Sequence, residues 1–461
     1  MKIRADLTDE LVEGLAVIRD QFKVPAAFPA PVVAAAAEAA RRQPTAHVDR
    51  TDWPFATLDP ASATDLDQAF HIEIADDDVL LHYAIADVAW FVVEGDPIDA
   101  EAWDRGTTQY LPDGRAGLYP ADLSEGAASL LPDGPRPAVV FHVRVDGGGE
   151  AKLDGAERSI VHSRAKLGYE NVSEAQLPDA LPELARRIAA AEERRGASRV
   201  EPPEQEVRVN QRGAYDIIFR PRTAAQDHNA AMSLATNLAI ADALFAAGTG
   251  LFRVMPDPDG RAEQRLRHTA RALGLDWPAS MPLRDFERSL HNGSPKPAAM
   301  AMAIRRAGGG ASYVPFAAGE RPWHSAMAAT YVHATAPLRR LADRYVVMAA
   351  LAVANGQPVA DDVRGAFPKL PPVMDRADHT AAQIEHAVIE LAESVLLSGQ
   401  VQRTFPAVVT DVDQRGARIQ LCDLPVVSRI TAQGLEPGDD VRVRIASVDV
   451  PARTATLERV A

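Results

Sequence analysis

The spacing of apolar residues changes twice along the chain, and each change limits the fold that the chain can adopt. Residues 69–74, 80–88 and 139–145 alternate or are mainly apolar, which indicates strands, and the glycines of 146–149 predict a hairpin turn. From residue 225 the spacing is helical, and five segments have the length and periodicity of helices: 225–247, 262–273, 297–307, 337–355 and 375–399. The chain is therefore expected to be an α+β protein, with a mixed β-sheet packed against helices.

The first 48 residues have a pattern of their own. Leu11, Leu15 and Ile18 lie on one face of a helix expected from Thr8, and Pro31 suits the first turn of a second helix. This pattern predicts a small helical unit over residues 1–48, with the shape of a helix-turn-helix. A helical arm packed on the main domain fits the same pattern.

The last part of the chain, residues 400–461, returns to short strands. They are expected at 407–412, 417–421, 441–448 and 454–459. A run of this length predicts a small five-stranded OB barrel, a fold that binds oligonucleotides. Arginines in the segment favour RNA as its ligand: Arg415, Arg418, Arg442 and Arg444. A barrel used only for packing is the alternative.

The net charge of −15 argues at first against a nucleic-acid partner, because phosphate binding needs cations. Binding depends on the local potential, however, and several arginines are clustered. The clusters are Arg220 with Arg222, Arg305 with Arg306, and Arg339-Arg340 with Arg344. No apolar run reaches the roughly 18 residues that cross a bilayer. With one cysteine, Cys422, and no secretory segment, a cytoplasmic protein is expected.

Three carboxylates lie within nine residues at Asp59, Asp65 and Asp67. Like charges held that close repel one another unless a cation neutralises them. Hard oxygen ligands favour Mg²⁺, which activates water and clamps the oxygens of a phosphodiester. Taken alone, the cluster is more often a solvated surface turn. A calcium loop is a further alternative, although the Gly and Glu positions of an EF-hand are missing.

A second group of polar residues surrounds Pro337. Pro337 is expected to open a helix, on which Arg339 and Asp343 would share one face. A guanidinium near a helix N-terminus makes a strong phosphate clamp. In isolation an ordinary intrahelical ion pair explains the spacing better, and His333 is more often structural than catalytic.

Together these segments resemble the RNase II/RNase R family of exoribonucleases, whose catalytic unit is the RNB domain. The motifs that carry the resemblance occur in the family's order at 59–70, 82–88, 105–112, 119–124, 163–169 and 335–340. The tail resembles the ribosomal S-one-type OB module that follows the catalytic unit. The resemblance implies an N-terminal helical domain at 1–48, an RNB catalytic domain at 49–399 and an OB domain at 400–461. It also implies processive 3′–5′ hydrolysis of single-stranded RNA to nucleoside 5′-monophosphates.

The resemblance also implies roles for individual residues. Asp59, Asp65 and Asp67, with Gln68, would hold one or two Mg²⁺ ions, with Mn²⁺ as the alternative. Asp67, Asp65, Tyr169 and Arg339 would be catalytic: Asp67 would be the most critical ligand, Tyr169 would contact RNA near the scissile phosphate, and Arg339 would clamp that phosphate. Tyr110 would stack on the terminal base. Glu385 would lie near the 3′-terminal nucleotide. A monomer without an obligate protein partner is expected.

The sequence departs from the family pattern at several positions. Gln68 stands where a fourth aspartate is usual, and Ala230-Ala231 align with paired glutamates, a role that Asp227 or Asn229 would have to take. Ala336 and Leu341 replace a usual Ser and Tyr, and the short helical start has no room for the family's cold-shock OB domains. Two alternatives to the exoribonuclease therefore stay open: a catalytically inert RNA-binding protein and a hydrolase of small phosphodiesters.

Overall fold

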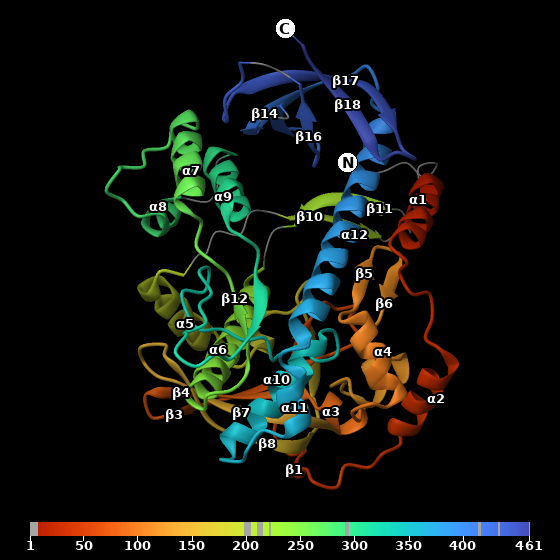
Figure 1. Cartoon of the computed structure of the whole chain (residues 1–461), viewed down its shortest axis with the longest axis vertical. Coiled ribbons are helices and arrows are strands. Elements are labelled where there is room, and N and C mark those ends of the chain that lie inside the picture. The colour runs from red at the N-terminus through yellow and green to blue at the C-terminus, as the bar shows by residue number, and fades with distance from the viewer. Residues whose placement is uncertain are drawn as a thin grey trace.

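A seven-stranded mixed sheet forms the lower part of the molecule in Figure 1. The computed structural model describes residues 8–197, 204–209, 215–220, 223–290, 295–413, 416–431 and 434–460. The order across the sheet is β1 (Val48–Arg50), β8 (Ala151–Val161), β7 (Arg136–Val145), β4 (Asp78–Ala86), β3 (Gln68–Ala75), β2 (Ala56–Asp59) and β9 (Ala165–Gly168). The β1–β8 and β2–β9 pairs are parallel and the others are antiparallel. The predicted mixed sheet is confirmed.

Some of the helices pack against this sheet, and others lie above it in Figure 1. The first are α1 (Thr8–Gln21), α2 (Ala30–Ala39), α3 (Val88–Phe91), α4 (Pro97–Arg105), α5 (Leu181–Arg195) and α6 (Ala224–Ala246). The later ones are α7 (Gly260–Ala272), α8 (Leu283–Ser289), α9 (Pro295–Ala307), α10 (Leu341–Ala354), α11 (Asp361–Ala366) and α12 (Leu370–Ser398). The alanine-rich α6 begins at a capping box of Thr223 and Gln226 and packs on β8, β7 and β4.

Two predicted helix starts are wrong. The helix expected over residues 375–399 begins earlier, at Leu370, and Pro371 and Pro372 lie in the first turn of α12, where the missing proline N–H is not needed. Pro337 does not open α10, which begins at Leu341. Residues 337–339 form a turn instead. The Arg339 carbonyl and the Leu341 N–H bond to residues 106–108, and the bonds within the turn are those from the N–H groups of residues 339 and 340 to Ala336 O.

Smaller elements surround the sheet. They are the hairpins β5 (Gln109–Leu111) with β6 (Gly114–Ala116), β10 (Glu204–Val209) with β11 (Tyr215–Arg220), and β12 (Leu251–Val254) with β13 (Ser312–Pro315), and the single turns η2 (Leu123–Ala127) and η3 (Glu174–Gln176). The helices α7, α8 and α9 have a core of their own, in which Trp277 stacks on Phe286 at 4.4 Å between ring centroids.

The C-terminal part forms a nearly closed five-stranded barrel at the top of Figure 1. Its order is β16 (Val427–Ile430), β15 (Gly416–Leu421), β14 (Thr404–Asp413), β17 (Asp440–Asp449) and β18 (Thr454–Val460), and the edge strands β16 and β18 contact each other. The predicted OB-type barrel is confirmed. Its short strand β16 was not located from the sequence.

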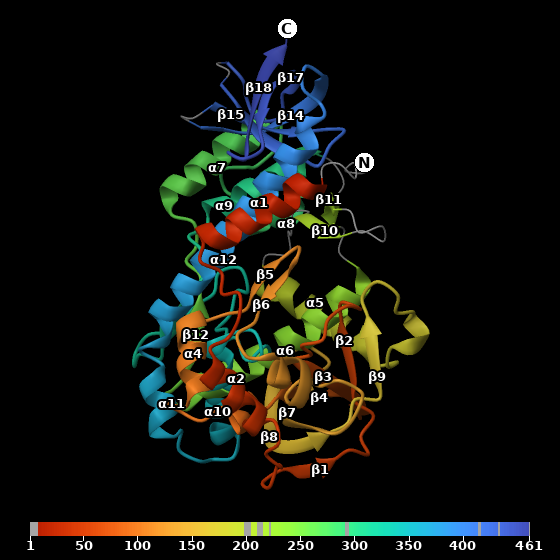
Figure 2. The same cartoon turned by 90° about the vertical axis from the view of Figure 1, so that its right-hand side faces the viewer.

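The long helix α12 joins the sheet to the barrel, and α1 lies along it (Figures 1 and 2). Leu11, Leu15 and Ile18 of α1 share one hydrophobic core with the second half of α12 and the inner face of the barrel. The buried residues of α2, Ala36 and Ala39, belong instead to the core of the main sheet. The two N-terminal helices therefore pack on different parts of the molecule. The division of the chain at residues 48 and 399 stays a prediction.

None of the helices described is both long enough and apolar enough to cross a membrane.

The buried carboxyl of Glu393 predicts a pH dependence of stability. Its Oε1 accepts hydrogen bonds from Gln205 Nε2 (2.6 Å) and the Val427 backbone N–H (2.8 Å), and burial raises its pKa from 4.5 to about 7. Between these values the folded chain holds a proton that the unfolded chain has lost, so the free energy of unfolding falls as pH rises.

We expect Glu393→Gln to remove this part of the dependence. Denaturation between pH 4 and 8 should show that the free energy of unfolding of the variant rises relative to that of the natural chain, by on the order of 3 kcal/mol above pH 7. Glu13→Gln, which removes an exposed carboxylate of α1, is the control. Parallel curves for Glu393→Gln and the natural chain would contradict the assignment.

Candidate active site

The loop between β2 and β3 carries the predicted carboxylates. Asp59 ends β2, Asp65 and Asp67 lie in the loop, and Gln68 begins β3. The loop is held by hydrogen bonds from Leu66 N–H to Ser129 Oγ (2.9 Å), from Leu130 N–H to Leu66 O (2.9 Å) and from Ala86 N–H to Asp67 O (2.9 Å). Backbone bonding on both sides of Leu66 therefore fixes where the neighbouring carboxylates point.

Asp67 is buried at the contact with the turn around Arg339. Its Oδ1 accepts a hydrogen bond from the Leu338 backbone N–H at 2.7 Å, and its Oδ2 lies 3.7 Å from Arg339 Nε. Burial raises the pKa of Asp67 to about 8, although the Arg339 charge and the Leu338 N–H both favour ionisation. The positive charge near Asp67 is therefore insufficient to offset the cost of burying an ionised carboxylate.

Asp59 shows the same shortage of positive charge. Its Oδ2 is buried and accepts no hydrogen bond from any residue that the structure describes. Burial raises the pKa of Asp59 to about 7, with the Asp65 charge adding to the rise and Arg339 opposing it. An orphaned carboxylate oxygen next to a second desolvated carboxylate is a donor set that fits a divalent cation with oxygen ligands.

Asp65 has protein partners in place of a cation. Its carboxylate pairs with Arg115 Nη1 and accepts a hydrogen bond from the Tyr110 hydroxyl at 3.1 Å. Across the described ranges, no three His, Cys, Asp or Glu side chains are grouped so that they could hold a metal ion. The predicted set of three carboxylate ligands is therefore not assembled in this conformation, and Asp65 would join it only by leaving Arg115.

Gln68 is the weakest of the predicted ligands. Its amide nitrogen donates to Thr335 O, and its amide oxygen accepts from the Tyr83 hydroxyl at 2.9 Å. The Tyr83 oxygen lies in turn 2.9 Å from Ser233 Oγ of α6. The amide of Gln68 thus links β3 to β4 through its oxygen and to the segment before Pro337 through its nitrogen. A metal ion would have to compete with Tyr83 for the amide oxygen.

The turn that presents Arg339 is fixed from two sides. The Arg339 carbonyl accepts hydrogen bonds from Thr107 Oγ1 (2.7 Å) and the Thr108 N–H (3.0 Å). On the other side, buried Asp343 accepts from the Ala336 N–H at 2.8 Å and pairs with Arg340 through both oxygens. The prediction that Arg339 and Asp343 share a helix face is wrong, because Arg339 precedes the helix.

The expected basic cluster at Arg339-Arg340 and Arg344 is wrong as a phosphate surface. Arg340 pairs with Asp343, and the guanidinium of Arg344 is buried against Asp99. The side chain of Arg339 is 41% exposed and is the member of the cluster left for a ligand. In the barrel, Arg444 pairs with Glu458 at 2.8 Å. The side chains of other expected cations lie outside the described residues: Arg220, Arg222, Arg305, Arg306 and Arg415.

The two predicted aromatic contacts lie beside the carboxylates. Tyr110 is 54% exposed, with its hydroxyl on Asp65, so its ring is available for stacking. The Tyr169 N–H donates to Asp59 O at 3.0 Å, and its hydroxyl accepts from Asn229 Nδ2 at 2.7 Å. Asn229 is thereby brought to the site, as expected for a substitute at the Ala230-Ala231 position. Glu385 is exposed on α12, which contacts β5.

Several residues of the site were not found from the sequence. Arg115 and Asn237 have no motif of their own, and Thr107 lies in the 105–112 motif without a predicted role. Asn237 holds the segment before Pro337 by accepting from the Ala334 N–H at 2.9 Å. The sequence offered one signal for Asn237: an asparagine on an apolar face of an alanine-rich helix is expected to be buried, and a buried amide needs hydrogen-bond partners. Arg115 and Thr107 depend on how the β5–β6 hairpin folds back, which local sequence does not specify.

Carboxylates contact an arginine-bearing turn beside a mixed sheet, and the same chain carries an OB-type barrel, which together define the class as α+β. The family model for the RNB domain matches residues 47–354, and the RNase II-type exonuclease C-terminal S1 domain matches residues 403–460. The chain therefore belongs to the RNB domain family.

Individual proteins resemble the chain at low identity. Ribonuclease R of Thermotoga maritima is 24% identical over 91% of this chain and 63% of that protein. The chain spans less than two thirds of the length of the ribonuclease R relatives that it matches first. The structure of Mycoplasma genitalium RNase R in complex with ribose-methylated single-stranded RNA matches with a TM-score of 0.86 at 20% identity, over 98% of this chain and 78% of that one. Yeast Ssd1, a pseudonuclease, matches with a TM-score of 0.67 at 16% identity, over 86% and 52%.

The buried Asp343–Arg340 pair is expected to stabilise the fold, because Asp343 holds the turn that carries Arg339. Asp343→Asn leaves a buried guanidinium without its counter-charge, so we expect the free energy of unfolding to fall by about 3–5 kcal/mol. Chemical denaturation measures the change. Asp361→Asn removes the partner of Arg364 from an exposed pair of the same spacing and should leave stability unchanged. Equal effects of the two substitutions would show that Asp343 does not hold the turn.

Proposed function

We propose that the chain is a processive exoribonuclease that hydrolyses single-stranded RNA from the 3′ end to nucleoside 5′-monophosphates. The observation that carries the proposal is the contact between the Asp59–Asp67 loop and the Arg339 turn within an RNB domain. Arg339 is exposed enough to receive a phosphate, and the carboxylates beside it lack positive charge. The named ribonuclease relatives support the same reading.

Asp59 and Asp67, with Asp65 after release from Arg115, are proposed to hold Mg²⁺, or Mn²⁺ in its place. Bound there, the ion would supply a water nucleophile and neutralise charge on the phosphodiester oxygens. The engaged amide of Gln68 favours one ion over two, because a second would have to displace Tyr83. The raised pKa values of Asp59 and Asp67 support a cation as their missing partner.

The protein groups have separate tasks in this proposal. Arg339 holds the scissile phosphate and stabilises the charge that develops on it. Tyr110 stacks on the terminal base, which selects no particular base because every base has a π-face. Tyr169, oriented by Asn229, contacts the RNA near the phosphate, and Glu385 lies near the 3′-terminal nucleotide. The barrel binds the strand ahead of the site.

A catalytically inert RNA-binding protein is the second candidate. It is favoured by Gln68, which stands at the usual aspartate position, and by the Asp65–Arg115 pair, in which a proposed metal ligand is bound to a cation of the protein itself. The cytoplasmic location, the monomeric state and the lack of an obligate protein partner stay predictions.

Asp67→Asn tests the catalytic assignment. The asparagine oxygen can still accept from Leu338, so the turn should stay in place while the ligand charge is lost. With 5′-labelled single-stranded RNA and Mg²⁺ we expect the natural chain to shorten the strand from the 3′ end, EDTA to stop it, and Asp67→Asn to bind RNA without turnover.

Asp361→Asn, on exposed α11, is the control for the loss of one carboxylate and should degrade RNA normally. RNA retention without mononucleotide release by the natural chain would favour the inert protein. Near-full activity of Asp67→Asn would overturn the site assignment.

Arg339→Ala tests the phosphate clamp separately. Loss of a donor aimed at developing charge lowers kcat by about 10²–10³-fold. Single-turnover assays with saturating enzyme separate this loss from weaker RNA binding. An unchanged single-turnover rate would show that Arg339 has another role.

A further inference from the structure

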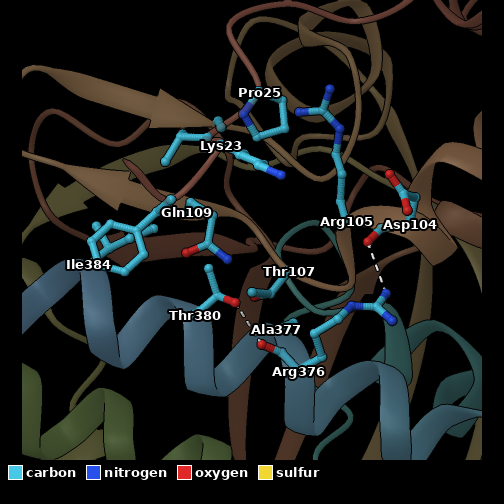
Figure 3. Close-up of a pocket in the computed structure, with 13 residues that line it drawn as sticks. Lys23, Pro25, Asp104, Arg105, Thr107, Gln109, Arg376, Ala377, Thr380 and Ile384 are labelled. Atoms are coloured by element: carbon cyan, nitrogen blue, oxygen red, sulfur yellow. Dashed lines mark hydrogen bonds between the residues drawn. The ribbon is translucent and has the colours of Figure 1, made fainter. Parts of the chain in front are cut away.

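A pocket separate from the carboxylate site lies where the end of α1, the β5–β6 hairpin and α12 meet (Figure 3). Its volume is about 170 Å³. None of the predicted catalytic, metal-binding or RNA-binding residues lines it. Its wall combines cationic and amide groups with apolar side chains, among them Phe22, Val24, Pro25 and Ile384.

Gln109 is the first sign that the pocket is built for a ligand. Its side chain is only 8% exposed and points into the pocket (Figure 3). No hydrogen bond to its side-chain amide is formed within the described ranges, and the amide is not among the fully enclosed polar groups that lack a partner. The amide therefore faces the pocket with donors and an acceptor that a ligand can use.

Lys23 is the second sign. It extends toward the pocket (Figure 3), and its ammonium group has no ion-pair partner among the residues that the structure describes. Its φ of +51° lies in the left-handed region, at the turn that ends α1, where glycine is the usual residue.

The charges around the pocket leave a positive excess. Arg376 donates one hydrogen bond, to Asp104 O at 3.2 Å, and keeps other N–H groups for a ligand. Arg105 is paired with Glu101 at 2.8 Å and donates to two backbone carbonyls, so it forms part of the wall. Three cations, counting Lys23, thus stand against the two carboxylates of Asp104 and Glu101, and an anion is favoured.

We propose that this pocket binds the phosphate monoester of a pentose, either a free sugar phosphate or a nucleoside 5′-monophosphate whose base stays outside. Lys23 and Arg376 bind the phosphate, and Gln109 bonds a sugar hydroxyl. A volume of about 170 Å³ holds one ring with its substituents, since a cavity of about 150 Å³ takes benzene. Drug-sized ligands need about 300 Å³ or more, which excludes a whole enclosed nucleotide. The apolar half of the wall fits the face of the ring.

The pocket is joined to the carboxylate site by the strand that forms its wall. Thr107 lines the pocket and donates to the Arg339 carbonyl, and Gln109 precedes Tyr110, whose hydroxyl bonds Asp65. A ligand that fixes residues 107–109 therefore also fixes the groups that hold Arg339 and Tyr110. The pocket itself does not depend on RNA hydrolysis, so its occupancy can be tested without RNA or metal.

Isothermal titration in EDTA with ribose 5-phosphate and with adenosine 5′-monophosphate tests the proposal, using the full Arg339→Ala chain and adding the variants below to it, so that no nucleotide is held by the proposed phosphate clamp. Both should bind at one site. Lys23→Gly and Arg376→Gln should each weaken binding at least about tenfold, because each removes a charge-assisted hydrogen bond. Lys23→Gly suits the left-handed turn, so misfolding cannot explain the loss. Lys152→Ala, an exposed lysine on β8, controls for total charge, and Asp67→Asn should bind normally.

Gln109→Leu separates a ligand-binding role from a structural one. It should weaken binding of ribose 5-phosphate while leaving the melting temperature unchanged, because the amide makes no hydrogen bond within the described part of the protein. A structural Gln109 would show a lowered melting temperature instead.

The two sources of the ligand are distinguished by their affinities. Equal affinity of both probes identifies the sugar phosphate as sufficient, and at least tenfold tighter binding of the nucleotide identifies it as the ligand. The proposal is overturned if inorganic phosphate binds as tightly as ribose 5-phosphate, if ribose binds equally well, if neither phosphate monoester binds at millimolar concentration, or if the Lys23 and Arg376 variants bind normally.

Discussion

The hydrogen bond from the Leu338 N–H to the buried carboxylate of Asp67 joins segments 271 residues apart, and the candidate site depends on it. It places the Arg339 turn against the β2–β3 loop. The turn can make this contact because it is not helical: Asp343 takes the Ala336 N–H, and residues 106–108 take the Arg339 carbonyl. The Arg339 carbonyl, which a helix would have used internally, thus bonds residues 107 and 108, and the Leu338 N–H is left for the Asp67 carboxylate.

The packing of α12 places the barrel in relation to this site. Its first half packs near the main sheet, and its second half shares a core with α1 and the barrel. Glu393 bonds both Gln205 and Val427 from within that contact. Because one helix contributes to both cores, the barrel and the site are held by the same 29-residue element.

The sequence predicted elements whose patterns are local. The strands around Phe70 and Val140 and the helices from Ala224 and Gly260 follow from periodicity, and the OB-type barrel follows from strand spacing. The start of α10 and the partner of Asp343 could not be predicted, because both depend on contacts with residues 106–108. The charge balance could not be predicted either. Arg340 is neutralised by buried Asp343 three residues further on, and Arg344 by buried Asp99 from a distant segment.

The three carboxylates of the loop differ in how their charge is balanced by the protein. Asp65 is paired with Arg115 and bonded to Tyr110, whereas burial raises the pKa of both Asp59 and Asp67 above the ordinary range of an aspartate. Arg339, 3.7 Å from Asp67, is too far and too exposed to offset that burial alone. A cation among these oxygens would compete with Arg115 for Asp65 and release Tyr110. In the proposed function, metal binding and the position of the exposed tyrosine ring would therefore be linked through a single carboxylate.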